Sequence, residues 1–156
     1  MSQRELVLNS GLVQFETLED IRGYVGRLLK LYESEVDSYT DKLGTLMREK
    51  EAKDRANRKK IVERNWQKVG FIYVNSIDPV LGTLELMLEA LEDYKAKVLR
   101  TREMLKDFDR LAELDVPRGA ILTLYLRNGV PLRIVVDTTK VPVIQAGQMV
   151  PAQQAA

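Results

Sequence analysis

The sequence predicts an α+β fold: an antiparallel helical hairpin, or a three-helix bundle, with a small antiparallel β-sheet built from a C-terminal hairpin and one or two N-terminal strands. Two long stretches repeat apolar residues at spacings of three and four, as amphipathic helices do. A later stretch alternates apolar and polar residues around Asn128-Gly129, which is typical of a β-hairpin. The 156 residues suffice for one domain with its own core, which we expect to span residues 1–140.

The N-terminal third predicts a short β-segment followed by a long helix. Residues 5–15 hold two apolar runs on either side of Asn-Ser-Gly, which predicts a small β-hairpin or a strand and turn. We predict helix one over residues 17–68. Its start is indicated by the residues TLED, which resemble a capping box. Its apolar seam thins after Leu46, where acidic and basic residues four apart still support a helix. A break at Gly44 or Asn57 would give the three-helix bundle.

The second helix is predicted over residues 79–114. Asp78 can cap it and Pro79 suits its first position. The preceding residues 69–76 fit a strand, a loop or a continuation of helix one, and the sequence leaves the three open. The apolar seam of helix two is the most regular in the chain and is typical of coiled-coil or bundle packing. Its predicted helix-interface residues are Leu84, Met87, Leu91, Tyr94, Val98, Leu105 and Phe108.

The C-terminal β-hairpin is predicted over residues 120–138. We expect a three-residue loop, Arg127-Asn128-Gly129, that pairs Leu126 with Val130, because a two-residue Asn-Gly loop would leave both faces mixed. Residues 141–156 are neutral and aperiodic, which predicts a flexible tail. The apolar face of the hairpin is the predicted β-interface, formed by Leu122, Leu124, Leu126, Val130, Leu132, Ile134 and Val136.

Opposite charges are concentrated in two adjacent blocks. Residues 48–68 hold nine basic and four acidic side chains, whereas residues 78–93 hold five acidic side chains and no basic ones. An antiparallel helical hairpin places these blocks side by side, so we interpret the basic block as an internal partner of the acidic one. The alternative is a nucleic-acid contact, in which basic side chains bind phosphates and the tryptophan stacks on a base. Its residues would be Lys59, Lys60, Arg64, Trp66 and Lys68.

The composition argues against most enzyme chemistry. Cysteine and histidine are both absent, which excludes thiolate nucleophiles, imidazole bases and Cys/His zinc sites. The chain has no glycine-rich phosphate loop and no calcium-loop motif, so we expect no catalytic activity, no cofactor and no metal. Its net charge is +1, and it has no apolar run long enough for a signal peptide or a membrane span. We therefore expect a cytoplasmic protein without a membrane partner.

The sequence favours a non-enzymatic assembly, adaptor or chaperone-like subunit that acts through coiled-coil helices and exposed β-edges. A lone two-stranded hairpin with one apolar face is marginally stable and needs a cover. That cover is either the N-terminal β-segment with the helices or another subunit. We therefore expect a homo-oligomer or a subunit of a hetero-complex, and the alternative function is that of a nucleic-acid-associated accessory protein.

Overall fold

The computed structural model describes residues 4–57, 66–139, 143–145 and 148–150 of the chain. Long helices occur together with antiparallel strands, so the predicted α+β fold class is confirmed. The chain divides into two compact units, Met1–Leu31 with Lys97–Ala156, and Tyr32–Ala96. In the part of the chain that the structure describes, no helix has the length and apolar character needed to cross a membrane.

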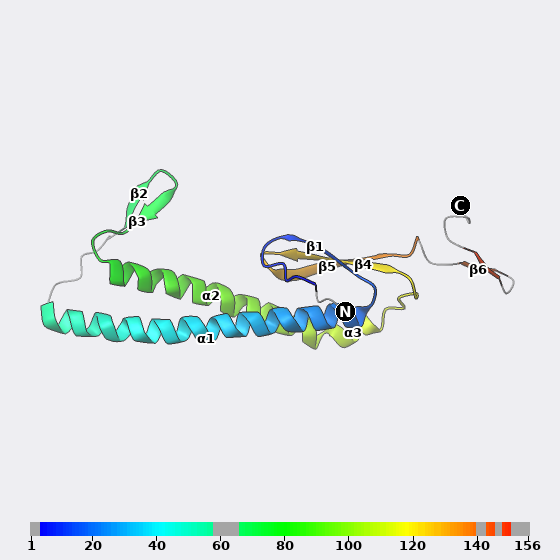
Figure 1. Cartoon of the computed structure of the whole chain (residues 1–156), viewed down its shortest axis with the longest axis horizontal. Coiled ribbons are helices and arrows are strands. Elements are labelled where there is room, and N and C mark those ends of the chain that lie inside the picture. Colours follow the sequence, from blue (N-terminus) through cyan, green and yellow to red (C-terminus); the bar gives the residue numbers. More distant parts are fainter. Residues whose placement is uncertain (1–3, 58–65, 140–142, 146–147, 151–156) are drawn as a thin grey trace. The chain divides into compact units, whose positions relative to one another are not determined.

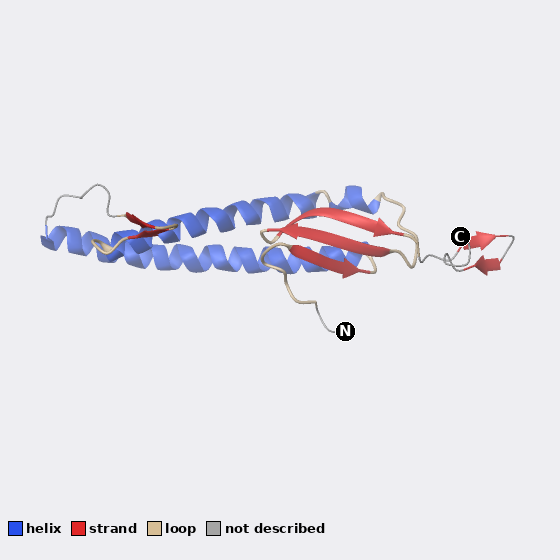
Figure 2. Cartoon of the chain, turned by 90° about the horizontal axis from the view of Figure 1, so that it is seen from above, coloured by secondary structure: helices blue, strands red, loops and turns tan. Residues whose placement is uncertain are grey.

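The first unit contains a three-stranded antiparallel sheet in the order β1-β4-β5 (Figures 1 and 2). Its strands are β1 (Gly11–Phe15), β4 (Ile121–Arg127) and β5 (Val130–Asp137). Alternate side chains of a strand share a face, and on the central strand β4 this face is fully buried at Leu122, Leu124 and Leu126. β1 adds to the same buried face, because Phe15 lies opposite Leu122.

Helical segments pack beside this sheet within the first unit. They are the beginning of α1 (Leu18–Asn57), the end of α2 (Pro79–Lys106) and the short α3 (Phe108–Ala112). Phe15 of β1 meets Tyr24 of α1 edge to face, with the ring centroids 5.2 Å apart. The predicted cap is present, since the Asp20 N–H donates to Thr17 Oγ1 at 3.1 Å. Thr101 is fully buried, and its hydroxyl donates to the Lys97 carbonyl at 2.6 Å.

The second unit is a helical hairpin that also carries a small β-hairpin. It contains the rest of α1, the strands β2 (Gln67–Val69) and β3 (Ile72–Val74), and the beginning of α2. Tyr39 of α1 stacks on Tyr94 of α2 at 5.7 Å, while Lys50 Nζ lies 3.4 Å from Asp78 Oδ2. Tyr39 comes before Lys50 along α1, whereas its partner Tyr94 comes after Asp78, the partner of Lys50. The two helices therefore run antiparallel. α1 continues through Gly44 without a break.

The predicted helix boundaries need two corrections. Helix one does not extend to Lys68, because Gln67–Val69 is a strand; α1 is described to Asn57, and residues 58–65 lie outside the described residues. The physical reason is the run VGFIYV, whose β-branched and aromatic residues favour a strand. Helix two is interrupted at Asp107, so it ends as α2 at Lys106 and resumes only as α3.

The predicted loop of the C-terminal hairpin is also wrong. Arg127 pairs with Val130, which leaves a two-residue Asn128-Gly129 loop. Both loop residues have positive φ, 52° and 75°, as a type I′ turn requires. This turn matches the twist of antiparallel strands, and Asn and Gly adopt its backbone at low cost.

A β-bulge reconciles this loop with the apolar pattern. Leu126 pairs with Pro131 and Tyr125 with Arg133, so Leu132 is the extra residue. Beyond the bulge Leu124 lies opposite Ile134, which restores the predicted common face although the predicted pairing is shifted by two residues. The alternating apolar pattern predicts only a regular register, because one extra residue in a strand leaves no periodic signal.

The two chain ends differ in part from the sequence predictions. The first apolar run does not form a strand with the second: β1 is the one N-terminal strand of the described residues, which fits the strand-and-turn alternative. The turn before β1 contacts the β4-β5 loop, where Gly129 N–H donates to the Asn9 carbonyl at 2.8 Å. Within the predicted flexible tail, β6 (Val143–Gln145) pairs with β7 (Gln148–Val150). The rest of residues 140–156 lies outside the described residues.

Candidate docking site

The β2-β3 hairpin of the second unit is the most exposed apolar element among the described residues. Val69 pairs with Ile72, so the loop consists of Gly70 and Phe71 alone. Gly70 has a φ of 61° and Phe71 does not have a positive φ, which is the pattern of a type II′ turn with glycine first. A side chain at Gly70 would meet no neighbour, so glycine is required there for its backbone conformation.

Apolar side chains cover this hairpin and lie open to solvent. Phe71 at the tip is fully exposed (102%), Ile72 and Ile77 are 67% exposed, and Tyr73 is 61% exposed. Val69 and Val74 are also exposed. One aromatic side chain carries about 150–250 Å² of surface, so this cluster reaches the size of patches that mark interaction sites in soluble proteins.

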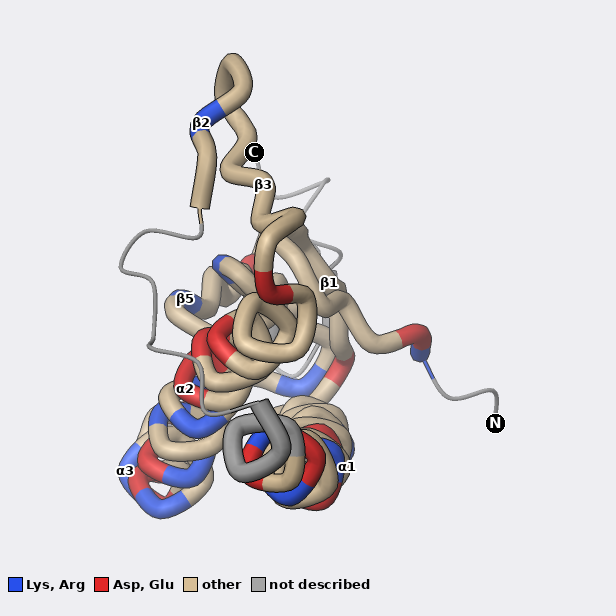
Figure 3. Tube along the Cα trace, turned by 90° about the vertical axis from the view of Figure 1, so that its left-hand side faces the viewer, with Lys and Arg blue, Asp and Glu red and all other residues tan. Residues whose placement is uncertain are grey.

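The hairpin has two chemically different faces. Side chains alternate along a strand and paired residues share a face, so one face holds Gln67, Val69, Ile72 and Val74, and the other holds Lys68 and Tyr73. Lys68 is the one charged residue between Trp66 and Ile77. Figure 3 shows this as a single basic position on β2, in contrast to the acidic and basic positions along α1 and α2. The first face is therefore uncharged, and it is apolar apart from Gln67.

Polar contacts fasten both ends of the hairpin to α2. At the incoming end Trp66 Nε1 donates a hydrogen bond to Glu85 Oε2. At the outgoing end the N–H groups of Ile77 and Asp78 donate to Asn75 Oδ1 at 3.2 and 3.0 Å. Asp78 then caps α2, because its Oδ1 accepts from the Leu81 N–H at 3.0 Å. The hairpin is thus held at its base while its tip is free of contacts within the described residues.

Asn75 fits closely against Gly82 of α2. A Cβ at Gly82 would lie 2.8 Å from Asn75 Nδ2, closer than real side-chain contacts allow. Asn75 Nδ2 is buried and has no acceptor among the described residues, which is an unusual state for a native amide. Gly82 therefore makes room for the residue that sets the exit of the hairpin.

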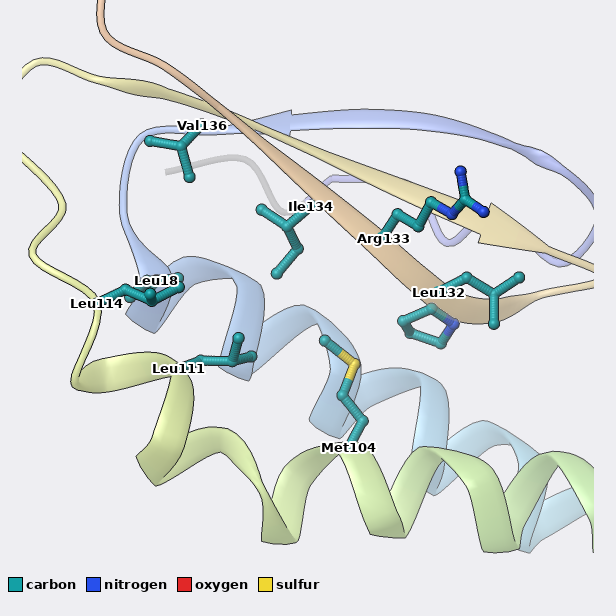
Figure 4. Close-up of a pocket in the computed structure, with 9 residues that line it drawn as sticks. Leu18, Met104, Leu111, Leu114, Leu132, Arg133, Ile134 and Val136 are labelled. Carbon is teal, nitrogen blue, oxygen red and sulfur yellow. The ribbon is translucent and has the colours of Figure 1, made fainter.

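The other candidate site is an apolar depression in the first unit, between β5 and the helices (Figure 4). Its volume is about 270 Å³, and its one charged lining residue is Arg133. The Arg133 side chain turns away from Met104 and Leu111 in Figure 4. Ligand pockets orient their ligand with a few convergent polar groups, which this depression lacks. It is a weaker candidate than the β2-β3 hairpin.

The predicted helix-interface residues lie on the inner side of α2 and α3. Leu91, Val98 and Phe108 are buried, and Leu84, Met87, Tyr94 and Leu105 are half-buried. Tyr94 contacts two tyrosines of α1, with ring centroids 5.7 Å from Tyr39 and 6.1 Å from Tyr32. Burial raises the pKa of Tyr94 above its ordinary value, with smaller contributions from the negative charges of Glu35 and Asp93 and from Tyr39.

The predicted β-interface residues are divided by burial. On β4 Leu122, Leu124 and Leu126 are fully buried, and Val130 at the start of β5 is buried as well. Further along β5 Ile134 is half-buried, whereas Leu132 and Val136 are exposed and line the depression of Figure 4. Leu132 is also the bulge residue, which the alternating pattern could not reveal.

The predicted nucleic-acid residues are only partly described. Lys59, Lys60 and Arg64 lie outside the described residues. Trp66 is half-buried and bonded to Glu85, and Lys68 is exposed on β2 beside Tyr73. The predicted contact between basic and acidic blocks is observed at Lys50 with Asp78, but its test at Lys59 and Arg64 lies outside the described residues.

Sequence reasoning missed the β2-β3 hairpin as a site. The signal was present, because Gly70-Phe71 has the Gly-X form of a two-residue type II′ loop and stands inside a β-branched and aromatic run.

Among the described residues no cluster of three or more carboxylates could hold a metal ion. No family model matches the chain, and neither the curated proteins nor the solved structures contain a significant match.

Proposed function

We propose that this chain is a non-enzymatic assembly or adaptor subunit whose docking element is the β2-β3 hairpin. The observation that carries the proposal is the fully exposed Phe71, held at the tip of a hairpin whose neighbouring apolar residues are exposed too. Large exposed apolar patches are typical of surfaces that bind other proteins. The exposed strand edges agree with this function, since an open edge can pair with a strand of another chain.

The anchoring of the hairpin supports binding energetically. Burying one large apolar side chain against a partner contributes about 1.5–3 kcal/mol. Part of that gain is normally lost because binding must order a mobile segment. The bonds from Trp66 to Glu85 and from the backbone to Asn75 order the base of the hairpin before binding. Phe71 and Ile72 are then presented at a lower entropic cost.

The proposal can be tested by comparing two variants in a capture experiment. Phe71→Ser combined with Ile72→Thr removes the apolar tip and keeps the β-compatible character of position 72. The matched control is Leu86→Ser, which changes a 54% exposed leucine on α2 of the same unit. We expect proteins captured from native extract by the wild type and by Leu86→Ser to be lost with the tip variant, and the same loss to recur with purified partners. Equal capture by all three proteins would refute the proposal.

The second candidate is a nucleic-acid-associated accessory protein. It is favoured by one observation, the exposed Lys68 across the ladder from the exposed aromatic Tyr73, with Phe71 nearby. A cation beside stacking aromatics is the arrangement that binds single strands. Lys68→Glu should then weaken binding of a labelled single-stranded oligonucleotide at low salt, and an absence of binding by the wild type would exclude this candidate.

A further inference from the structure

We infer that β3 pairs with β3 of a second copy of this chain, around a two-fold axis at Tyr73, to form a four-stranded antiparallel sheet in the order β2-β3-β3-β2. This inference rests on the proposed function, because it names the partner of the same hairpin. In the part of the chain that the structure describes, β2 and β3 form a two-stranded sheet, so the outer edge of β3 meets no other strand. Such an edge is a ready template for pairing.

The turn fixes which backbone groups of β3 point outward. In a hairpin with a two-residue loop, the residues that flank the loop exchange hydrogen bonds, and here these are Val69 and Ile72. Hydrogen-bonded and non-hydrogen-bonded pairs alternate along an antiparallel ladder, so Lys68 and Tyr73 form a non-hydrogen-bonded pair. The N–H and C=O groups of Tyr73 therefore point away from β2 and are available to another strand.

Antiparallel pairing at Tyr73 is self-complementary. The two Tyr73 residues would exchange both of their outward backbone hydrogen bonds, and Ile72 of each copy would lie opposite Val74 of the other. Residues opposite each other share a face, so Val69, Ile72 and Val74 of both copies would form one continuous apolar patch, with Gln67 of each copy at its edge. The existing exposed apolar face would thereby double in area.

Charge selects the β3 edge over the β2 edge. Pairing β2 with β2 around Lys68 would place the two lysines directly opposite, about 5.5 Å apart at Cα, which is destabilising. Pairing β3 with β3 separates them by three strand spacings, about 14 Å. That separation exceeds the screening length of about 8 Å in physiological salt. The charge of Lys68 thus disfavours pairing of β2 with β2 and is compatible with pairing of β3 with β3.

A second strand suits this hairpin better than a lipid surface. The outward N–H and C=O groups of Tyr73 would find no hydrogen-bonding partner in hydrocarbon, where unsatisfied backbone groups cost several kcal/mol. Glu85 of α2, which accepts the hydrogen bond from Trp66 at the base of the hairpin, would also be repelled by anionic headgroups. Strands of only three residues bury a small area, so we expect weak association with a dissociation constant on the order of micromolar.

The absence of native cysteine allows a direct test by cross-linking of the full-length chain. Tyr73→Cys places two thiols opposite each other at about 5.5 Å between Cα atoms, within the range of a disulfide. The matched control Lys68→Cys sits on the same rung of the hairpin, but its copies would be about 14 Å apart, too far for a disulfide. We expect mild oxidation to convert Tyr73→Cys to a dimer at least tenfold faster than Lys68→Cys. Equal rates, or faster cross-linking of Lys68→Cys, would overturn the inference.

Sedimentation of unmodified chains supplies the second readout. Tyr73→Pro removes the outward N–H and no hydrogen bond of the hairpin itself, and Lys68→Pro does the same on β2. Across about a hundredfold concentration range around 10 µM, we expect the wild type and Lys68→Pro to dimerise and Tyr73→Pro to remain monomeric. Wild-type protein that stays monomeric overturns the inference, as does flotation with phosphatidylcholine vesicles that requires Phe71. If a monomeric wild type still captures proteins through its hairpin tip, the inference fails and the proposed function stands.

Discussion

The indole Nε1 of Trp66 donates a hydrogen bond to Glu85 Oε2 and joins the incoming end of the β2-β3 hairpin to α2. Trp66 is the single tryptophan of the chain, so its fluorescence reports on this junction alone. Glu85 is also one of the five acidic residues of the block at 78–93. The Glu85 carboxylate thus contributes to the negative charge at the start of α2 and also holds the base of the exposed hairpin through Trp66.

Glu85→Ala should loosen the hairpin without unfolding α2, because alanine is a good helix former and removes only the acceptor. A hydrogen bond to a charged group contributes about 1.5–3 kcal/mol, and we expect the lower end here because Trp66 is only half-buried. The measurement is the emission maximum of Trp66, which should move to longer wavelength as the indole enters water. Glu85→Gln keeps an acceptor and should keep the wild-type spectrum. A normal spectrum for Glu85→Ala would show that the bond does not order Trp66.

Gly82→Ala should destabilise the second unit although glycine-to-alanine changes in helices usually stabilise. The usual gain is about 1 kcal/mol, but the new Cβ would lie 2.8 Å from Asn75 Nδ2 and displace the amide that binds Ile77 and Asp78. The matched control is Gly44→Ala in α1 of the same unit, where the nearest neighbour is the flexible end of Arg48 at 4.0 Å. Urea denaturation should give a lower midpoint for Gly82→Ala and a higher one for Gly44→Ala. A higher midpoint for both would mean that Asn75 moves at no cost.

Two roles of Asp78 can be separated by substitution. Its Oδ1 caps α2 through the Leu81 N–H, and its Oδ2 lies 3.4 Å from Lys50 Nζ. Asp78→Asn keeps a capping oxygen and removes the charge, so we expect a loss in unfolding free energy of at most about 1 kcal/mol. Asp78→Ala removes both and should cost about 1–2 kcal/mol more, measured by urea denaturation. Equal losses for the two variants would assign the whole effect to the ion pair.

The sequence predicted the elements whose pattern spans many residues. The apolar seam from Leu84 to Phe108 and the alternation on β4 each repeat over several turns or residue pairs, so one exception does not obscure them. The facing charge blocks predicted the antiparallel course that Lys50 and Asp78 show. In the candidate site, the sequence of residues 69–76 allows a strand but does not indicate that the strand is exposed. Periodicity indicates which residues share a face and not whether that face has a partner.

Local details escaped prediction because single residues decide them. The type I′ turn at Asn128-Gly129 and the bulge at Leu132 compensate each other, so the apolar pattern alone fits either register. The end of α1 before Gln67 was obscured by acidic and basic residues four apart, which support a helix locally even where the chain turns to strand. The contact of Gly82 with Asn75 joins residues seven apart through a turn and leaves no periodic signal.

The raised pKa of Tyr94 predicts a loss of stability at alkaline pH. Burial is the main cause, and the nearby charges of Glu35 and Asp93 act in the same direction, so the folded chain holds the phenol proton more tightly than the unfolded chain does. The stabilising contribution of this group is complete below the unfolded pKa of about 10 and is lost as the pH rises through the folded value. Phenylalanine fills the same place beside Tyr39 and Tyr32 and cannot ionise.

The free energy of unfolding of the wild type should therefore fall relative to that of Tyr94→Phe as the pH rises above about 10. Comparing the two proteins by urea denaturation at each pH cancels the titration of the other tyrosines and the lysines. Difference absorbance of the phenolate should show one tyrosine with a raised pKa in the wild type that is missing in Tyr94→Phe. If the stability curves of the two proteins ran parallel, ionisation of Tyr94 would not affect the packing of α1 against α2 in the second unit.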